Sequence, residues 1–211
     1  MKTSVLVIGL GRFGAAAARE LMALGHEVLA VDSSEAVVND IAPDVTHAVQ
    51  LDAADEAALR AIGAAEFEHA IVAISSGVEA SIFAVMALKK LGVGNVVAKA
   101  GSTLHGAILQ RIGADRVVYP EREMGQRVAH SFAIADVVDY LDVAPRFGLV
   151  KVRPAERWVG RALAEIDAQL TAVALRRGDA VTVNPAGTER IQAGDEVILI
   201  GRDDLLERLQ A

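Results

Sequence analysis

The run SVLVIGLGRFG at Ser4–Gly14 decides the fold of the first half of the chain. It starts with a strand-like apolar stretch, and the G-x-G-x-x-G pattern of Gly9, Gly11 and Gly14 leads directly into a segment with helical spacing. In such a turn the first glycine permits a tight bend, the second lets the backbone approach a pyrophosphate, and the third allows the helix to pack closely on the strand. The helix N-terminus adds free N–H groups. The stretch predicts a nucleotide-binding loop, with a loop kept only for packing as the alternative.

The nucleotide-binding pattern also includes an acidic residue at the end of the next strand. Asp32 closes the next strand-like run, 21 residues after Gly11. A carboxylate at this position accepts hydrogen bonds from ribose hydroxyls and repels a 2′-phosphate. We therefore expect Asp32 to bind the ribose of a nucleotide, and we count its neighbour Ser33 among the cofactor-binding residues.

The first 120 residues alternate strand-like and helix-like segments. The strand-like runs are mostly continuous in Val, Ile, Leu and Ala, which is typical of strands covered on both faces. They span residues 4–8, 27–31, 46–51, 70–74, 95–98 and 116–119. The helix-like segments span residues 12–24, 34–41, 55–62, 79–91 and 104–112, and C-terminal caps are predicted at Gly25, Gly63, Gly92 and Gly113. The alternation predicts an α/β fold over residues 1–120, a Rossmann-like doubly wound parallel six-stranded sheet.

The pattern changes after Pro120. Residues 121–145 are expected to form a crossover or linker helix segment, because Glu121–Leu141 permits a long helix. Residues 146–211 are expected to form a second, smaller α+β domain. Its strand-like runs are residues 149–152, 172–175, 181–183 and 196–200, and its candidate short helices are residues 160–166 and 203–209.

The composition excludes several classes of protein. The chain has 211 residues, of which 53% are hydrophobic, and it has no cysteine, so thiol nucleophiles, zinc-thiolate sites and iron–sulfur clusters are excluded. With 28 Asp and Glu against 21 Lys and Arg, the net charge of −7 argues against nucleic acid as the main partner. No apolar run approaches the roughly 20 residues of a bilayer span, and no signal peptide is evident. We expect a soluble, cytoplasmic protein.

In an open α/β sheet the ligand binds beyond the carboxyl ends of the strands. This rule adds six cofactor-binding candidates: Asp52, Ala53, Ile74, Ser75, Lys99 and Glu121. Asp52 and Ser75 could border an adenine pocket, and Lys99 could add positive charge for phosphates. Glu121 could hold a cation between phosphates or brace Arg12. Each alone could equally be an ordinary loop residue. Their shared position at the carboxyl ends of the strands is what indicates a common binding site.

Arg12 is unusual within the glycine loop, because it puts a cation at the first turn of a helix, where the dipole disfavours one. Its guanidinium could bind terminal phosphates, or it could pair with a nearby acid on the surface. Phe13, between Arg12 and Gly14, completes the candidate loop. The sequence contains no G-x-x-x-x-G-K-[ST] motif, so hydrolysis of the P-loop kind is not predicted.

No catalytic group emerges from the five histidines. The first three, His26, His47 and His69, lie near strand beginnings, at the edge opposite the ligand, and His130 lies on the long segment after Pro120. His105 lies near a helix N-terminus on the ligand side, with no evident partner. Without a cysteine or a His–acid pair, we predict no catalytic residues and no enzyme.

Several stretches together resemble the KtrA/TrkA family of potassium-uptake regulatory subunits. They are GLGRFG at 9–14, GHEVLAVD at 25–32, IGADRVVYPE at 112–121, MG at 124–125 and IQAGDEVILIG at 191–201. The resemblance covers essentially the whole chain. The first domain resembles an RCK N-domain (TrkA-N), and the last 65 or so residues resemble an RCK C-domain (TrkA-C).

This resemblance implies a cytoplasmic gating ring at the inner face of the membrane. Subunits would pair, dimers would assemble into an octamer, and the ring would dock under a membrane potassium channel or transporter subunit of the KtrB/TrkH kind. KtrA-like members bind ATP or ADP and TrkA-like members NAD or NADH. Arg12 resembles the KtrA-like arginine that faces the terminal phosphate, and Glu121 a glutamate that binds a cation, such as Mg, Ca or Na, beside the nucleotide. ATP or ADP is therefore favoured, with NAD(H) as the alternative.

One stretch departs from the family pattern. Family C-domains usually carry an Arg-x-x-x-Gly-like segment before the second strand, part of the pocket that binds cyclic di-AMP in some members. Here residues 164–170 run almost directly into residues 171–175, with neither the Arg nor the Gly. Cyclic di-AMP binding is therefore not carried over from the family to this chain.

Two rival functions stay open. An NAD-dependent oxidoreductase is disfavoured by the small second domain and by the missing acid–base pair. The sequence also does not exclude a third function, a stand-alone nucleotide sensor with some other partner.

Overall fold

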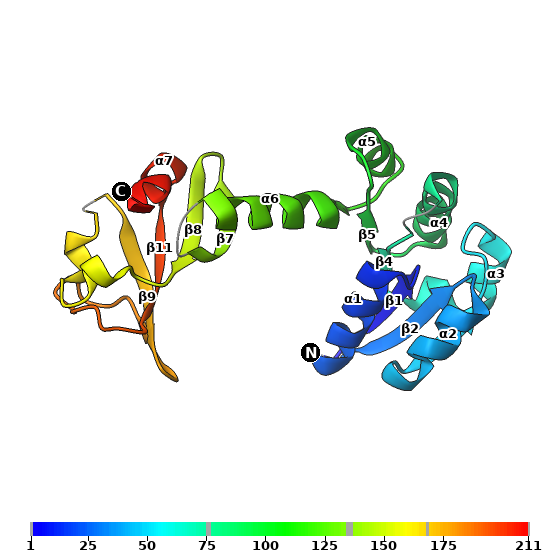
Figure 1. The fold of residues 1–211 in the computed structure, drawn as a ribbon. Helices are drawn as coiled ribbons and strands as arrows, with labels where there is room; N and C mark the ends of the chain where they lie inside the picture. Colours follow the sequence, from blue (N-terminus) through cyan, green and yellow to red (C-terminus); the bar gives the residue numbers. More distant parts are fainter. Residues whose placement is uncertain (1, 75–76, 134–136, 168, 211) are drawn as a thin grey trace. The chain divides into compact units, whose positions relative to one another are not determined.

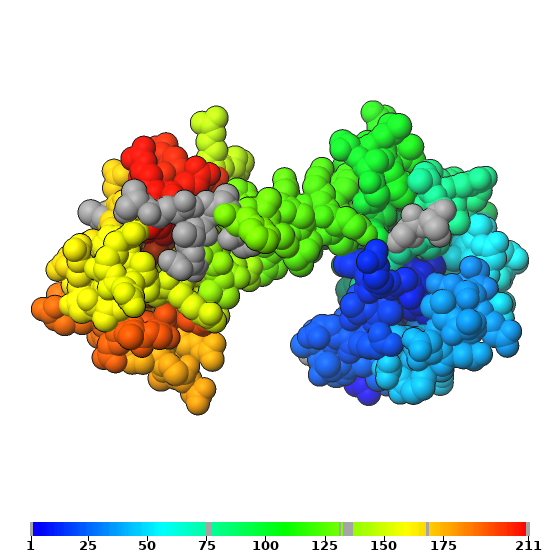
Figure 2. All heavy atoms as spheres, viewed as in Figure 1, coloured from blue at the N-terminus to red at the C-terminus, as the bar shows by residue number. Residues whose placement is uncertain are grey.

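The computed structural model describes residues 2–74, 77–133, 137–167 and 169–210. Contacts between Cα atoms divide the chain into two compact units, Met1–Glu121 and Arg122–Ala211, drawn as a ribbon in Figure 1 and with all heavy atoms in Figure 2. Each unit contains its own β-sheet and its own hydrophobic core. Apart from Glu121, the residues expected to link the domains (121–145) fall within the second unit.

The first unit contains a parallel six-stranded sheet with the strand order β3-β2-β1-β4-β5-β6. The strands are β1 (Ser4–Ile8), β2 (Glu27–Asp32), β3 (His47–Gln50), β4 (His69–Val72), β5 (Asn95–Lys99) and β6 (Arg116–Val118). The helices are α1 (Arg12–Ala23), α2 (Glu35–Ile41), α3 (Glu56–Ala61), α4 (Val78–Leu91) and α5 (Thr103–Arg111), with 3-10 turns at Ala42–Asp44 and Ala64–Glu66. The order reverses between β1 and β4, so the predicted doubly wound, Rossmann-like sheet is confirmed.

Neighbouring residues of β1 enter two different cores, because helices cover both faces of the sheet. Val5 and Val7 belong to a cluster with residues of α1 and α2, whereas Leu6 and Ile8 belong to a cluster with residues of α3, α4 and α5. All four side chains are at most 5% exposed. The predicted glycine caps are confirmed by positive φ angles at Gly25, Gly63, Gly92 and Gly113.

The second unit contains an antiparallel five-stranded sheet with the strand order β10-β9-β11-β8-β7. The strands are β7 (Val137–Ala144), β8 (Phe147–Val152), β9 (Thr171–Arg177), β10 (Ala180–Val183) and β11 (Glu196–Arg202). Helix α6 (Pro120–Ala133) starts at the end of the first unit, and short turns follow as η3 (Glu156–Trp158), η4 (Leu163–Glu165), α7 (Asp203–Leu206) and η5 (Glu207–Gln210). This unit is the second, smaller α+β domain that the sequence predicts.

Strand β7 corrects the long helix predicted over Glu121–Leu141, because residues 137–144 pair with β8. Two adjacent β-branched residues, Val137 and Val138, favour a strand here. Tyr140 is 2% exposed, and its ring lies so close to Gly148 of β8 that a Cβ there would overlap it. The short helix predicted at residues 160–166 is also corrected, because only the 3-10 turn η4 forms there.

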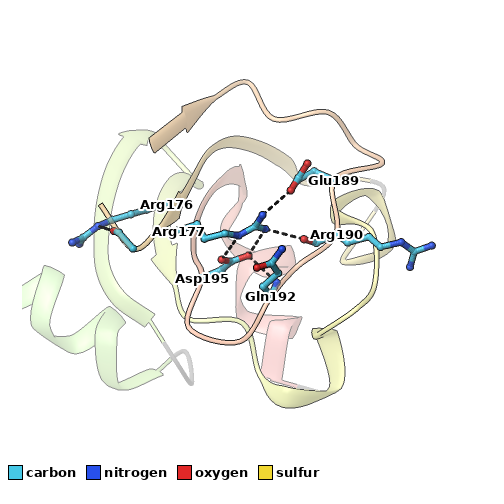
Figure 3. A network of polar contacts seen from close by, with 7 residues as sticks. Arg176, Arg177, Glu189, Arg190, Gln192 and Asp195 are labelled. Carbon is cyan, nitrogen blue, oxygen red and sulfur yellow. Dashed lines mark hydrogen bonds and ion pairs between the residues drawn. The ribbon is translucent and has the colours of Figure 1, made fainter. Parts of the chain in front are cut away.

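An arginine–carboxylate network holds the segment between β10 and β11 (Figure 3). Arg177 of β9 donates from Nε and Nη2 to the two carboxylate oxygens of Asp195, each at 2.9 Å, and from Nη1 to Glu189 at 3.1 Å. The Asp195 side chain is fully buried and also accepts the Gln192 N–H at 2.8 Å. The Arg177 guanidinium holds the pKa of Asp195 below its ordinary value. Arg177 thereby ties the middle of the segment, at Glu189, and its buried end, at Asp195, to β9.

Candidate functional site

A cavity of about 300 Å³ lies at the carboxyl ends of β1, β2, β3 and β4, where the strand order reverses. Seven of the residues predicted to bind a cofactor line it: Gly9, Gly11, Asp32, Ser33, Asp52, Ala53 and Ile74. The rest of its lining is apolar or small: Ile8, Val31, Val37, Leu51, Ala73, Gly77 and Ala80. Ser75, also predicted, lies outside the described residues. The cavity has the position at which open α/β sheets bind ligands.

The three glycines of the loop have different surroundings. A Cβ on Gly9, whose φ is 87°, would lie 2.8 Å from the backbone nitrogen of Ile74. A Cβ on Gly14 would overlap the carbonyl oxygen of Gly9, so α1 can pack on the turn only without one. A Cβ on Gly11 would meet no atom within 4 Å, and Gly11 lines the cavity. The backbone of Gly11 is therefore open to a ligand, which fits a pyrophosphate.

The N-terminus of α1 has no side-chain cap. Its N-cap residue is Gly11, which has no side-chain oxygen to accept hydrogen bonds from the first N–H groups of the helix. These donors, together with the positive end of the helix dipole, suit a phosphate group.

Asp32 is fixed at the edge of the cavity by backbone donors. Its Oδ2 accepts the Leu10 N–H at 2.7 Å, and its Oδ1 accepts the Ser34 N–H at 2.9 Å. The carboxylate is thus oriented between the glycine loop and the start of α2. Each oxygen can accept a further hydrogen bond, so the two hydroxyls of a ribose have suitable acceptors here.

Asp52 and its neighbours Leu51 and Ala53 also line the cavity. The Asp52 Oδ1 accepts the Ala54 N–H at 2.9 Å, which fixes a turn after β3. Leu51 comes directly before Asp52 and could have been found from the strand-end rule, whereas Val37 on α2 and Ala80 on α4 reach the cavity only through helix packing. These apolar walls suit the flat face of a base.

The remaining predicted residues gather beside the loop, outside the cavity lining. Lys99, at the end of β5, donates from Nζ to Glu121 Oε1 at 2.6 Å, and the same nitrogen lies 6.0 Å from the centre of the Phe13 ring. The hydrogen bond from Lys99, helped by the Glu121 backbone N–H and by the charge of Arg12, lowers the pKa of Glu121. The structure thus brings Arg12, Phe13, Lys99 and Glu121 together.

The cation expected at Glu121 finds few ligands in the described part of the chain. Within residues 2–74, 77–133, 137–167 and 169–210, no group of three or more Asp, Glu or His side chains could hold a metal ion. The Glu121 carboxylate is bonded to an ammonium group instead. Phosphate oxygens of a ligand, or groups of another subunit, would have to complete the coordination shell.

His105 corrects the expectation that it lacks a partner. Its Nδ1 accepts the Gly101 N–H at 3.3 Å, and its Nε2 lies 2.7 Å from Ser81 Oγ, which donates to the Val78 carbonyl at 2.8 Å. The side chain is buried, and this burial lowers its pKa. A neutral ring with the hydrogen on Nε2 satisfies the whole chain of bonds, so His105 joins α5 to α4 as a structural residue.

Among the described residues, every helix is too short or too polar to cross a bilayer.

Family models match the chain over most of its length, the TrkA-N domain at residues 5–120 and the TrkA-C domain at residues 148–211. "Ktr system potassium uptake protein C" of Bacillus subtilis (strain 168) is 40% identical over 205 residues, which are 95% of this chain and 93% of that protein.

Solved structures share the fold at low sequence identity. The GsuK channel bound to NAD matches with a TM-score of 0.68 and 16% identity, over 100% of this chain and 39% of that one. GsuK bound to ADP matches with a TM-score of 0.53 and 18% identity, over 60% of this chain and 33% of that one. Both domains and the close relative agree, so the chain belongs to the KtrA/TrkA family of potassium uptake proteins, which combine a TrkA-N and a TrkA-C domain.

Proposed function

We propose that this protein is a cytoplasmic regulatory subunit that binds a nucleotide and thereby gates a potassium uptake channel or transporter. The observation that carries the proposal is the cavity at the glycine loop, with the open backbone of Gly11 at one side and the oriented carboxylate of Asp32 at another. Membership of a potassium uptake family supplies the process that the nucleotide would control.

ATP or ADP is the favoured ligand. The cavity would hold the adenosine, Asp32 the ribose, and the N-terminus of α1 the first phosphates. Arg12 follows Gly11 directly and would face the terminal phosphate, where a nicotinamide nucleotide carries no such charge. NAD(H) is the second candidate, since one neighbour of the same fold is bound to NAD and another form of it to ADP.

The proposed action is regulation without catalysis. The titratable side chains of the cavity lining are the two carboxylates Asp32 and Asp52, and the described part of the cavity holds no base paired with an acid.

A bound nucleotide would shift the equilibrium between two arrangements of an oligomeric ring. The shift in free energy is no larger than the difference in the nucleotide's affinity for the two arrangements. The partners would be other copies of this chain, as dimers forming an octamer, and a KtrB/TrkH-like membrane subunit. A Mg, Ca or Na ion at Glu121 would add to the phosphate contacts.

Calorimetric titration of the nucleotide-stripped full chain with ATP, ADP and NADH tests the proposal, with the mass in solution measured alongside. The test variant is Gly11→Leu, which fills the open face of the loop. The matched control is Gly125→Leu on α6, where a Cβ also meets no atom within 4 Å. We expect Gly11→Leu to abolish nucleotide binding and the control to retain it. Equal binding by both variants would contradict the site.

Arg12→Ala tests which nucleotide the loop prefers. Loss of a charged contact to the terminal phosphate should weaken ATP by about tenfold more than ADP. An unchanged ATP/ADP ratio would contradict the role of Arg12, and tighter binding of NADH than of either would favour the NAD(H)-sensing alternative. Co-purification with a membrane potassium transporter subunit would separate this function from that of a stand-alone sensor.

A further inference from the structure

Lys99 is a buried lysine whose ammonium group has a carboxylate partner. Its side chain is 6% exposed, and its Nζ lies 2.6 Å from Glu121 Oε1. Burying an ammonium group is costly unless a counter-charge accompanies it. Glu121, whose side chain is 64% exposed, supplies that counter-charge from the first turn of α6. One partner of the pair is therefore fixed in the protein, while the other has room to leave.

The pair lies beside the loop that would receive the phosphates of a ligand. The Lys99 ammonium is 6.0 Å from the ring centre of Phe13, which belongs to the glycine loop. The charge of Arg12 is near enough to contribute to the lowered pKa of Glu121. Two positive side chains and one negative one therefore share a small region at the uncapped N-terminus of α1. A phosphate that enters this region meets Glu121 as a like charge and as a rival acceptor.

We propose that the Glu121 carboxylate is an internal competitor of the nucleotide's outermost phosphate for Lys99. Binding of the phosphate exchanges one anion for another at Lys99 and releases Glu121. This inference rests on the proposed function and adds the regulation of the same site. Since Glu121 is the second residue of α6, the exchange also changes what holds the first turn of that helix.

The exchange orders the events at the site. Glu121 bonded to Lys99 is occupied, and Glu121 released by a phosphate becomes available to a cation. A cation at this position would therefore follow the phosphate rather than prepare the site for it. Without cations, removing the charge of Glu121 should help the nucleotide to bind, whereas removing a residue that acts only as a cation ligand should leave cation-free binding unchanged.

Calorimetric titration of the full chain with ADP and with ATP, in EDTA, tests this competition. The variant is Glu121→Gln, which removes the charge at an exposed position, and the matched control is Glu20→Gln, an exposed acid of α1. We expect Glu121→Gln to tighten ADP binding by about fivefold or more, the gain from removing one like charge at contact distance, and to tighten ATP binding further. The control should stay within twofold of the unaltered chain, about the level of a screened surface charge.

A double-mutant cycle with Lys99→Met separates exchange at Lys99 from simple repulsion. If Glu121 competes for Lys99, the gain from Glu121→Gln should shrink in the Lys99→Met background, with circular dichroism used to verify that both backgrounds are folded. An equal gain in both backgrounds, or unchanged or weaker binding by Glu121→Gln in EDTA, would overturn the proposal. Failure of the unaltered chain to bind any nucleotide would instead overturn the proposed function.

Discussion

The two units bury different kinds of groups. In the first, the side chains of the central strand β1 enter two apolar clusters, and the carboxylate at the site, Asp32, is held by backbone N–H groups. In the second, two carboxylates of the closing strand region are buried among cations. Asp195 is held by Arg177, and Glu196, 11% exposed, bonds to three side chains: Lys151 at 2.6 Å, Arg176 at 3.2 Å and Arg153 at 3.4 Å. The site carboxylate of the first unit is thus held by backbone donors, whereas these two carboxylates of the second unit are held by cationic side chains.

Gly14→Ala should break the first unit more strongly than any other change considered. The added Cβ would overlap the Gly9 carbonyl, so the loop or α1 must move, at a cost of about 3 kcal/mol in the free energy of unfolding of this unit. Nucleotide binding should be lost with the shape of the loop. Urea-dependent hydrogen exchange, measured separately on peptides of each unit, checks the cost. The control Gly125→Ala lies in an open position, and an equal effect of both variants would contradict the packing argument.

Asp195→Asn should break the second unit and spare the first. Arg177 would lose its buried charged partner but keep Glu189, so we expect a loss of about 2 kcal/mol in the unfolding free energy of the second unit. The matched control is Asp179→Asn in the exposed turn between β9 and β10. The same exchange experiment measures both, and nucleotide affinity should not change. Equal destabilisation of the two units would contradict the comparison.

This difference also explains how far the sequence could predict the fold. The elements of the first unit follow from local patterns, because buried strands, helical spacing and glycine caps all lie within short windows. The local pattern of Glu121–Leu141 permits a long helix, whereas pairing with β8 and burial of Tyr140 decide the strand over residues 137–144. The Arg177–Asp195 pair joins residues 18 positions apart in sequence, and no local pattern announces it.

The candidate site also contains residues that local patterns predict and a contact that only the fold reveals. The residues found by motif and by strand-end position, such as Gly11, Asp32 and Asp52, do line one cavity. The sequence suggested Lys99 for phosphates and Glu121 for a cation, but the bond between the two depends on the register of β5 with β6 and on the start of α6 at Pro120. An ion pair between residues at the ends of two neighbouring strands can be assigned only when the pairing of those strands is known.

Acid should weaken the second unit through its two carboxylates that are paired with cations. Arg177 lowers the pKa of Asp195, and Lys151 lowers that of Glu196, so these carboxylates stabilise the fold above their ordinary pKa values, and this stability is lost as the pH falls through the lowered values. As the pH falls below 5, the second unit should therefore become progressively less stable. Hydrogen exchange or urea unfolding at several pH values checks this. In Asp195→Asn the pH dependence of this unit should be smaller, and an unchanged slope would contradict the assignment.

Two lysine substitutions, with the smallest expected effects, test whether burial sets the strength of an ion pair in each unit. Lys90 bonds to Glu56 in the first unit at 2.7 Å, and Lys151 bonds to Glu196 in the second at 2.6 Å, but Lys90 is 69% exposed and Lys151 is 29% exposed. An exposed pair contributes little because water and salt screen it, so Lys90→Met should cost less than about 0.5 kcal/mol in unfolding free energy. Lys151→Met should cost about 1 kcal/mol, limited by the two arginines that still face Glu196. Equal losses of unfolding free energy, measured by urea unfolding with hydrogen exchange in each unit, would mean that burial does not determine how much these ion pairs stabilise the fold.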